Sequence, residues 1–398
     1  MSSQTNTLTE GPLAKQIFLV SLPLALSNLL VARFYGARHP KDVEKTVHSA
    51  AIISAVAGVV LLLIGLLGSP AMLRLLNTKV DLLPGAILYL RVYFLGMPAL
   101  ALYNFGNAVF SSIGDTKKPL MYLSIAGALN IALNLFFVIV CDLSVVGVAL
   151  ASAISQCVSA FLVLRALTRV KDCYALDFHK AALDPATTQR ILALGIPAGL
   201  QNAIFAIANL FIQAGVNSFD SLMVKGNSAA ANADNLIYDA MAAFYMACAS
   251  FMSQNYGAGN LKRVKKGTWV TLAMGVLYTL CTGALLLAFQ NPIMHLFTSD
   301  ETVVAFGCSA MHYFCPFYFL LSILHGMAGA VRGTGRSVPP MVVLLVSLCL
   351  FRVVWIQFLL PFFSGIEGVF ILYPVSWGLG ALLMILYAWK GKWMEYHT

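Results

Sequence analysis

Ten apolar runs dominate the sequence, and each is long enough to cross a lipid bilayer as a helix, which takes about 18 or more residues. In hydrocarbon every backbone N–H and C=O must be paired within its own segment, and the runs are too long and too continuous for barrel strands. With a shorter eleventh run at 16–32, the sequence predicts an all-α polytopic membrane protein of about 10–11 transmembrane helices. The ten runs are residues 47–68, 85–110, 119–140, 143–165, 190–217, 227–251, 268–290, 304–330, 340–362 and 366–389.

Composition agrees with a bilayer and excludes several other classes of protein. Charged residues make up 10% of the chain, whereas a soluble protein has about 25%, so no soluble catalytic domain is expected. The net charge of +9 does not indicate nucleic-acid binding, because the basic residues lie in the short gaps between apolar runs, where charge sets orientation. The eight cysteines include no C-x-x-C pair, and no acid/base or nucleophile constellation appears at membrane depth. We therefore expect no metal, no cofactor and no enzyme.

Lysine and arginine are concentrated in alternate gaps. One set of gaps holds 19 of them and the opposite set holds three, so the first set is expected to be cytoplasmic. The longest cytoplasmic gap, residues 166–189, is the one credible linker, and it divides the chain into an N-terminal bundle, 1–165, and a C-terminal bundle, 190–398. A multi-pass protein of the plasma membrane (cell inner membrane) is the expected product.

The two halves repeat one another with a constant offset in residue number. Tyr35 falls on Tyr256, the segment from Gly114 to Pro119 falls on that from Gly335 to Pro340, and Ser155 falls on Ser376. A shared offset over separated landmarks indicates two homologous bundles of the six-helix type, arranged as parallel repeats.

Upstream of Tyr35 the offset changes. The segment from Lys15 to Pro23 matches that from Gln189 to Pro197 at a smaller offset, which leaves 47 residues in the second half without a counterpart in the first. We expect the first bundle to lack most of one helical hairpin near residues 24–34, where an intact version of the fold would have twelve spans in all.

Two phrases carry a resemblance to a known family. They are Gln254-Asn-Tyr-Gly-Ala-Gly-Asn260, followed by basic residues, and Arg332-Gly-Thr-Gly-Arg-Ser-Val-Pro-Pro340. With the two halves and the linker, they resemble the multidrug and toxic compound extrusion (MATE) transporters over nearly the whole chain. The resemblance implies a monomeric antiporter that exchanges small amphipathic or cationic drugs for H⁺ or Na⁺ as its two bundles rock about a central cavity.

Amide side chains form a stripe on the run at 190–217. Their spacing of 7, 4 and 4 keeps them within about an 80° arc of a helix, and they could line a drug cavity or act as interhelical hydrogen-bonding groups. The same two interpretations apply to pairs in the first half. The candidates are Asn202, Asn209, Gln213 and Asn217, with Gln201 beside them, and Asn104, Asn107, Asn130 and Asn134 in the first half.

Asp234 and Asp239 are the only acids well inside a span, and Asn235 lies one turn before Asp239 on the same face. A carboxylate at membrane depth is costly as an anion, and H⁺, Na⁺ or a cationic drug can each neutralise it. These three residues are our cation-coupling candidates. Alternatively, Asp234 lies near the outer interface, or one of the acids pairs with a basic residue such as Arg352.

The resemblance also implies coupling acids that this chain does not supply. One falls inside the missing hairpin, and two other family positions offer only Gln201 and Asn202 in one helix and His312 and His325 in another. The main alternative to an active exporter is a transport-inactive remnant left by an internal deletion. A flippase of lipid-linked sugars, as in related exporter families, would require a more basic cavity than the sequence shows.

Overall fold

The computed structural model describes residues 29–75, 83–217, 219–363, 365–390 and 393–394. It divides into two compact units, Met1–Gly199 and Leu200–Thr398. Within the described residues all regular structure is helical, which confirms the all-α prediction. The expected run at 16–32 and most of the expected gap near 24–34 lie outside the described residues.

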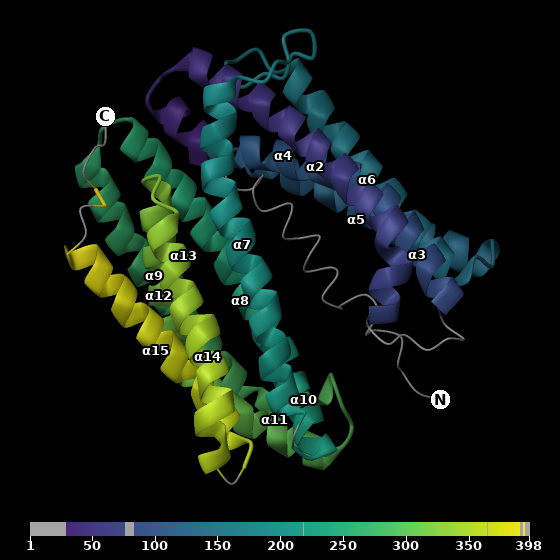
Figure 1. Ribbon diagram of the computed structural model, residues 1–398, viewed down its shortest axis with the longest axis vertical. Coiled ribbons are helices and arrows are strands. Elements are labelled where there is room, and N and C mark those ends of the chain that lie inside the picture. Colours follow the sequence, from purple (N-terminus) through teal and green to yellow (C-terminus); the bar gives the residue numbers. More distant parts are fainter. Residues whose placement is uncertain (1–28, 76–82, 218, 364, 391–392, 395–398) are drawn as a thin grey trace. The chain divides into compact units, whose positions relative to one another are not determined.

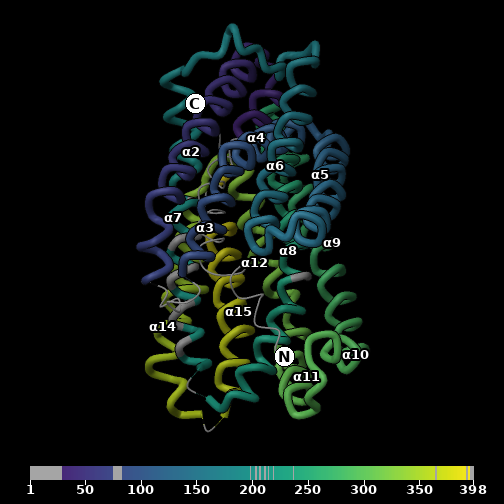
Figure 2. Tube along the Cα trace, turned by 90° about the vertical axis from the view of Figure 1, so that its right-hand side faces the viewer, coloured from purple at the N-terminus to yellow at the C-terminus, as the bar shows by residue number. Residues whose placement is uncertain are grey.

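The first unit is built around α4. The helices α2 and α6 pack on it, and α5 packs mainly on α6 (Figure 2). Residues 29–36 are helical as well, and α5 continues into a π-helical turn, Phe136–Val140. The bounds are α2 (Pro40–Leu75), α3 (Leu83–Leu95), α4 (Met97–Ile113), α5 (Lys117–Leu135) and α6 (Ser144–Arg169).

The second unit has α12 at its centre. The helices α8, α9 and α15 pack on α12, and α13 runs beside α15 (Figure 1). Short π-helical and 3-10 turns join α13 to α14 and continue to Phe362. α7 (Pro185–Val216) begins in the first unit and continues into the second. The other bounds are α8 (Ser221–Gly257), α9 (Leu261–Ala288), α10 (Gln290–His295), α11 (Glu301–Phe314), α12 (Tyr318–Gly333), α13 (Val338–Leu345), α14 (Phe351–Val354) and α15 (Glu367–Lys390).

The repeat found in the sequence reappears in the backbone. When the numbering is offset so that Tyr35 falls on Tyr256, α2 falls on α9 and α6 falls on α15. The turns match as well: Gly114 has a φ of 93° and Gly335 a φ of 91°. The second copy has Gly259, with a φ of 74°, where the first copy has Arg38, with a φ of 58°. The two bundles therefore share their turns as well as their helices, although a left-handed arginine is unusual.

The membrane-spanning helices follow the apolar runs, with one systematic difference. Eight described helices are long and apolar enough to cross a membrane, and a bent pair, α3 with α4, makes a ninth. The expected span at 190–217 coincides with α7. The run at 85–110 is not one straight helix, because it bends by 40° at Gly96, and the run at 304–330 passes through a 3-10 turn at Cys315–Phe317 within one continuous span. Proline lies at the start of α4 and of this 3-10 turn, where a missing N–H costs little.

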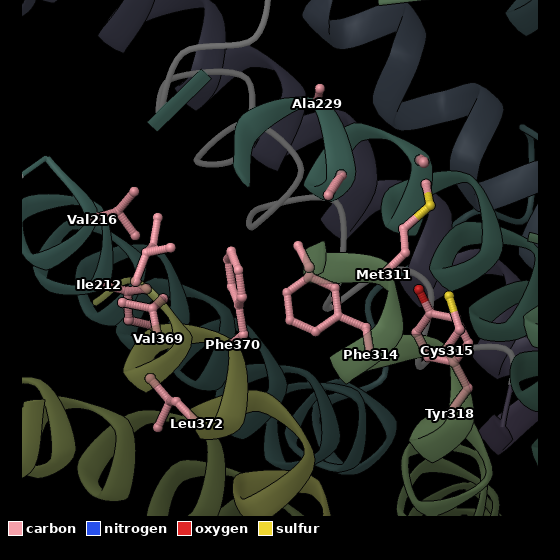
Figure 3. Packing of buried hydrophobic residues seen from close by; sticks show 14 of the residues in the cluster. Ile212, Val216, Ala229, Met311, Phe314, Cys315, Tyr318, Val369, Phe370 and Leu372 are labelled. Atoms are coloured by element: carbon pink, nitrogen blue, oxygen red, sulfur yellow. The ribbon is translucent and has the colours of Figure 1, made fainter. Parts of the chain in front are cut away.

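Aromatic side chains form the core of the second unit. Phe314 of α11 meets Phe370 of α15 edge to face, with ring centroids 5.9 Å apart, and meets Tyr373 at 4.9 Å. Figure 3 shows Phe314 and Phe370 next to one another, with Cys315 and Tyr318 beyond them. Such pairs add to the burial of apolar area and fix α11 against α15.

Many apolar side chains point away from both cores. Leu67 is 79% exposed and Ile131 is 65% exposed, and of the α5 residues Lys117–Leu135 only Pro119 and Ala126 are buried. In water this much exposed apolar surface would be a liability, whereas in a bilayer it is the surface that contacts lipid.

The linker packs against the first turns of α2. The Asp177 N–H donates to His48 Nε2 at 3.1 Å, the Asp184 N–H donates to Ser49 Oγ at 3.1 Å, and Lys45 Nζ lies 3.3 Å from Asp184 Oδ1. Asp184 also caps α7, because its Oδ2 accepts hydrogen bonds from the Thr187 N–H and hydroxyl at 2.9 Å and 2.6 Å. The linker thus belongs to the first unit.

Replacing Asp184 by alanine should loosen this junction more than replacing Lys45 by glutamine. The two donors of Thr187, and then Lys45, lower the pKa of Asp184 from 3.8 to about 2. Because this pKa is lowered, the ionised Asp184 carboxylate stabilises the folded junction fully above pH 3.8, and this stabilisation is lost as the pH falls toward about 2. It is therefore fully present at neutral pH. At pH 7 we expect the Thr187 and Thr188 amides to exchange hydrogen about fivefold faster in Asp184→Ala. Equal rates in Asp184→Ala and the native protein, or a larger effect of Lys45→Gln, would contradict this ranking.

Candidate functional site

The amide stripe of α7 lies outside the packed core of its unit. Asn209, Gln213 and Asn217 are exposed, and Gln213 Nε2 donates to Asn217 Oδ1 at 2.8 Å, one turn further along the chain. The positions just before each of them, at Ala208, Ile212 and Val216, are the buried ones. The structure therefore gives these three amides no interhelical hydrogen bond within the described residues. The side chain of Asn202 lies outside the described residues.

Gln201 belongs to a different face of α7. It is buried, and its Oε1 accepts a hydrogen bond of 2.7 Å from Arg332 Nη2 at the end of α12. This contact joins α7 to α12 and satisfies part of a guanidinium that would otherwise be costly at this depth. Gln201 therefore ties two helices together, which is the packing interpretation given above for the amides.

The structure separates the two acids of α8. Asp234 is half-buried, and its carboxylate lies near the Tyr318 hydroxyl of α12. Asp239 and Asn235 are both exposed on another face. Asp234 lies thirteen residues after Ser221, the first residue of α8, which is about 20 Å along a helix.

Arg352 lies near Asp234 without pairing with it. The two side chains are close enough to interact electrostatically, but among the described residues no ion pair joins them. Arg352 is only 9% exposed. Its Nε donates to Ser376 Oγ at 2.9 Å, and its guanidinium lies 4.7 Å from the centre of the Tyr373 ring. Arg352 thus joins α14 to α15.

His325 adds a third polar group in the interior of this unit. Its ring meets Tyr238 of α8 edge to face at 5.5 Å, and its Nε2 is buried with no hydrogen-bond partner among the described residues. Arg332 and Arg352 both act on it electrostatically. The sequence pattern does not single out Tyr238, Tyr318 or Arg332, because both tyrosines lie inside long apolar runs and Arg332 lies just past the end of one.

The amides of the first unit are mostly engaged within it. Asn134 Nδ2 donates to Asn130 Oδ1 at 3.0 Å, and Asn130 Nδ2 reaches Ser152 Oγ of α6 at 3.5 Å, which links α5 to α6. Asn107 Oδ1 accepts from Ser111 at 3.3 Å within α4, and Asn104 is half-buried. The Asn130 contact is the interhelical type, and none of these four is exposed as the α7 stripe is.

No described group of three or more His, Cys, Asp or Glu side chains could hold a metal ion. The chemical resources of the second unit are therefore one half-buried carboxylate, several tyrosine hydroxyls, two guanidiniums and an exposed row of amides. This set can bind and exchange small ions and ligands, and it contains no activated nucleophile.

Comparisons with known proteins point to transporters, in agreement with a site that can bind and exchange small ions and ligands. The MatE family profile matches residues 16–136 and 197–356. The chain is 29% identical over 335 residues to the probable multidrug resistance protein YpnP of Bacillus subtilis, covering 82% of this chain and 72% of that protein. It is 22% identical over 394 residues to the probable multidrug resistance protein NorM of Thermotoga maritima, covering 95% and 82%. Another relative, 24% identical over 357 residues and covering 87% and 77%, is an FAD transporter of Shewanella oneidensis.

The fold has solved counterparts as well. The outward-facing structure of a multidrug resistance MATE family transporter superposes with a TM-score of 0.89 at 20% identity, covering 94% of this chain and 85% of that one. At this identity the likeness concerns the fold alone.

Proposed function

This chain belongs to the MatE family, and on that premise we propose that it is a secondary active multidrug efflux antiporter. In this proposal it exports small amphipathic or cationic compounds in exchange for H⁺ or Na⁺ by alternating access, as a monomer in the plasma membrane. The observation that supports it most is the exposed amide row of Asn209, Gln213 and Asn217 on α7. In a chain with 10% charged residues, such a row is an uncommon polar surface at membrane depth.

Uncharged amides suit a transporter of varied substrates. An amide both donates and accepts hydrogen bonds, and it carries no charge that would have to be matched by each ligand. Asn209, Gln213 and Asn217 are therefore proposed to line the substrate path, with Asn202 on the same stripe. Asn104 and Asn107 of α4 are weaker candidates for the first unit, and Asn130 and Asn134 are better explained by helix packing.

Asp234 is proposed as the coupling residue. Its carboxylate has the Tyr318 hydroxyl in reach and no ion pair among the described residues, so as an anion at membrane depth it is costly until a cation arrives. A proton, Na⁺ or a cationic substrate can each neutralise it, and their competition for one carboxylate exchanges one for another. Asp239 and Asn235, being exposed, form a second candidate pair.

A transport-inactive remnant is the alternative that one observation favours. The first family match, 16–136, is shorter than the second, 197–356, which agrees with a hairpin missing from the first bundle. Both proposals retain the same fold and the same absence of an enzymatic role, so only a transport measurement separates them.

The decisive test is dye export by the purified protein in liposomes. If the antiporter proposal is correct, a fluorescent cationic dye should move against its gradient when an H⁺ or Na⁺ gradient is imposed, and dissipating that gradient with an ionophore should stop it. Protein-free liposomes are the control. No movement under either gradient, together with transport by a variant whose first half has the missing hairpin restored, would establish the remnant instead.

A further inference from the structure

The first turns of α9 carry an unusual charge pattern. Lys262, Arg263, Lys265 and Lys266 are all exposed, and Lys262, Lys265 and Lys266 share one helix face with Trp269, because they are spaced at i, i+3, i+4 and i+7. Arg263 lies beside them with its guanidinium 5.6 Å from the Phe251 ring. By the distribution of lysine and arginine, this end of α9 is at the cytoplasmic membrane surface.

The equivalent face of the first bundle is neutralised by the protein itself. In the register that places Tyr35 on Tyr256, Lys265 corresponds to Glu44 and Arg263 to Asp42, so acids alternate with lysines at the start of α2. Lys45, the counterpart of Lys266, pairs with Asp184 at 3.3 Å. His48, the counterpart of Trp269, is buried and accepts the Asp177 N–H. In the first copy, acidic residues of the chain itself thus balance the positive charge, and the linker covers the face.

The second copy lacks such counter-charges among the described residues. No described acid pairs with Lys262, Lys265 or Lys266, and like charges three and four residues apart repel one another. The first turn of a helix is also its positive end, which disfavours cations and attracts anions. The lysines of α9 therefore repel one another and also lie at the positive end of the helix. Both unfavourable interactions indicate that an anion from outside the chain binds here.

Apolar surface follows the basic face deeper along α9. Trp269 is 67% exposed, and Val270, Met274 and Leu277, which follow it on the adjoining side of the helix, are exposed as well. Tryptophan favours the boundary between head groups and hydrocarbon, so a ligand that meets the lysines with an anionic group meets an apolar wall immediately deeper. A soluble anion would contact the lysines but would leave the apolar surface without a partner.

We infer that the start of α9 binds the head group of an anionic phospholipid of the cytoplasmic leaflet, with Lys262, Lys265 and Lys266 on the phosphate and Trp269 against the glycerol and upper acyl chains. The first bundle needs no such lipid, because Asp177 and Asp184 of the linker occupy the equivalent face. This inference does not depend on whether the chain transports drugs.

The test compares the second copy of this face with the first copy, which serves as the internal control. Arg263→Asp with Lys265→Glu gives the second copy the charge pattern of the first. The control, Arg38→Asp with Lys41→Glu, makes the same change in net charge at exposed positions of the first copy. Each full-length protein is placed in nanodiscs of phosphatidylcholine with increasing phosphatidylglycerol, and retained phosphatidylglycerol is counted by native mass spectrometry.

The native protein and the control should retain phosphatidylglycerol at equal lipid fractions, and the Arg263→Asp/Lys265→Glu variant should need on the order of tenfold more. Trp269→Ala leaves the charge unchanged and should also weaken retention, which a purely electrostatic attraction would not predict. A milder variant, Lys265→Gln with Lys266→Gln, serves if the double reversal does not fold. Equal retention by variant and control would overturn the inference, and so would displacement of the lipid by millimolar inorganic phosphate, which would make this a site for free anions.

Discussion

Replacing Asp234 by asparagine is expected to slow ion-driven export strongly while leaving the protein folded. Asparagine keeps the size of the side chain and an oxygen that can accept hydrogen bonds, but it can no longer gain or lose the charge for which ions and substrates are proposed to compete. Export of a cationic dye under an H⁺ or Na⁺ gradient should fall by roughly tenfold to a hundredfold, the usual range for a coupling free energy between two ligands. Initial rates in proteoliposomes measure it.

Two further variants make this result specific. Glu301→Gln removes an acid whose side chain is 84% exposed, and it should transport normally. Tyr318→Phe removes only the hydroxyl in reach of Asp234, and it should shift the ion concentration at half-maximal rate more than the maximal rate. If Asp234→Asn exports dye at the native rate and Asp239→Asn does not, the coupling role belongs to the exposed acid of α8.

The helices and the repeat could be read from the sequence because both depend on strong local signals. A span needs a long apolar run, and the common offset between the halves survives in turns such as Gly114 and Gly335, whose left-handed φ favours glycine. The bend at Gly96 and the 3-10 turn at Cys315–Phe317 could not be read in the same way. Hydropathy continues across them without interruption, and only the nearby prolines hint at a new helix start.

The polar side chains show where sequence reasoning stops. Gln201 is adjacent in sequence to Asn202, the first residue of the stripe that continues at Asn209, Gln213 and Asn217. Gln201 is bonded to Arg332, whereas the last three residues of the stripe are exposed. Periodicity defines a face of one helix, but it does not say which neighbouring helix covers that face. The same limit applies to α8, where the choice between Asp234 and Asp239 depends on the position of Tyr318, which lies far along the chain on α12.

The second large effect is expected on stability, from replacing Gly333 at the end of α12, where two helices of the second unit pack closely. A Cβ atom added at Gly333 would lie 2.6 Å from the Met252 Cβ and 2.7 Å from the Ala249 carbonyl oxygen of α8. Neither atom belongs to the far end of a flexible side chain, so α8 and α12 would have to separate. Gly333→Leu should therefore destabilise the C-terminal unit by about 3 kcal/mol, the upper part of the usual range for overpacking.

Gly127→Leu is the matched control, because Gly127 also lies in a membrane helix but a Cβ there would meet nothing within 4 Å. Leucine at that position should be neutral or slightly stabilising, since glycine costs about 1 kcal/mol in a helix interior. Thermal unfolding of both variants in the same detergent, followed by the monodisperse fraction in size-exclusion chromatography, compares them. Should Gly333→Leu remain as stable as Gly127→Leu, α8 and α12 do not approach one another this closely, and the position of Asp234 beside Tyr318, which depends on the same pair of helices, would have to be revised.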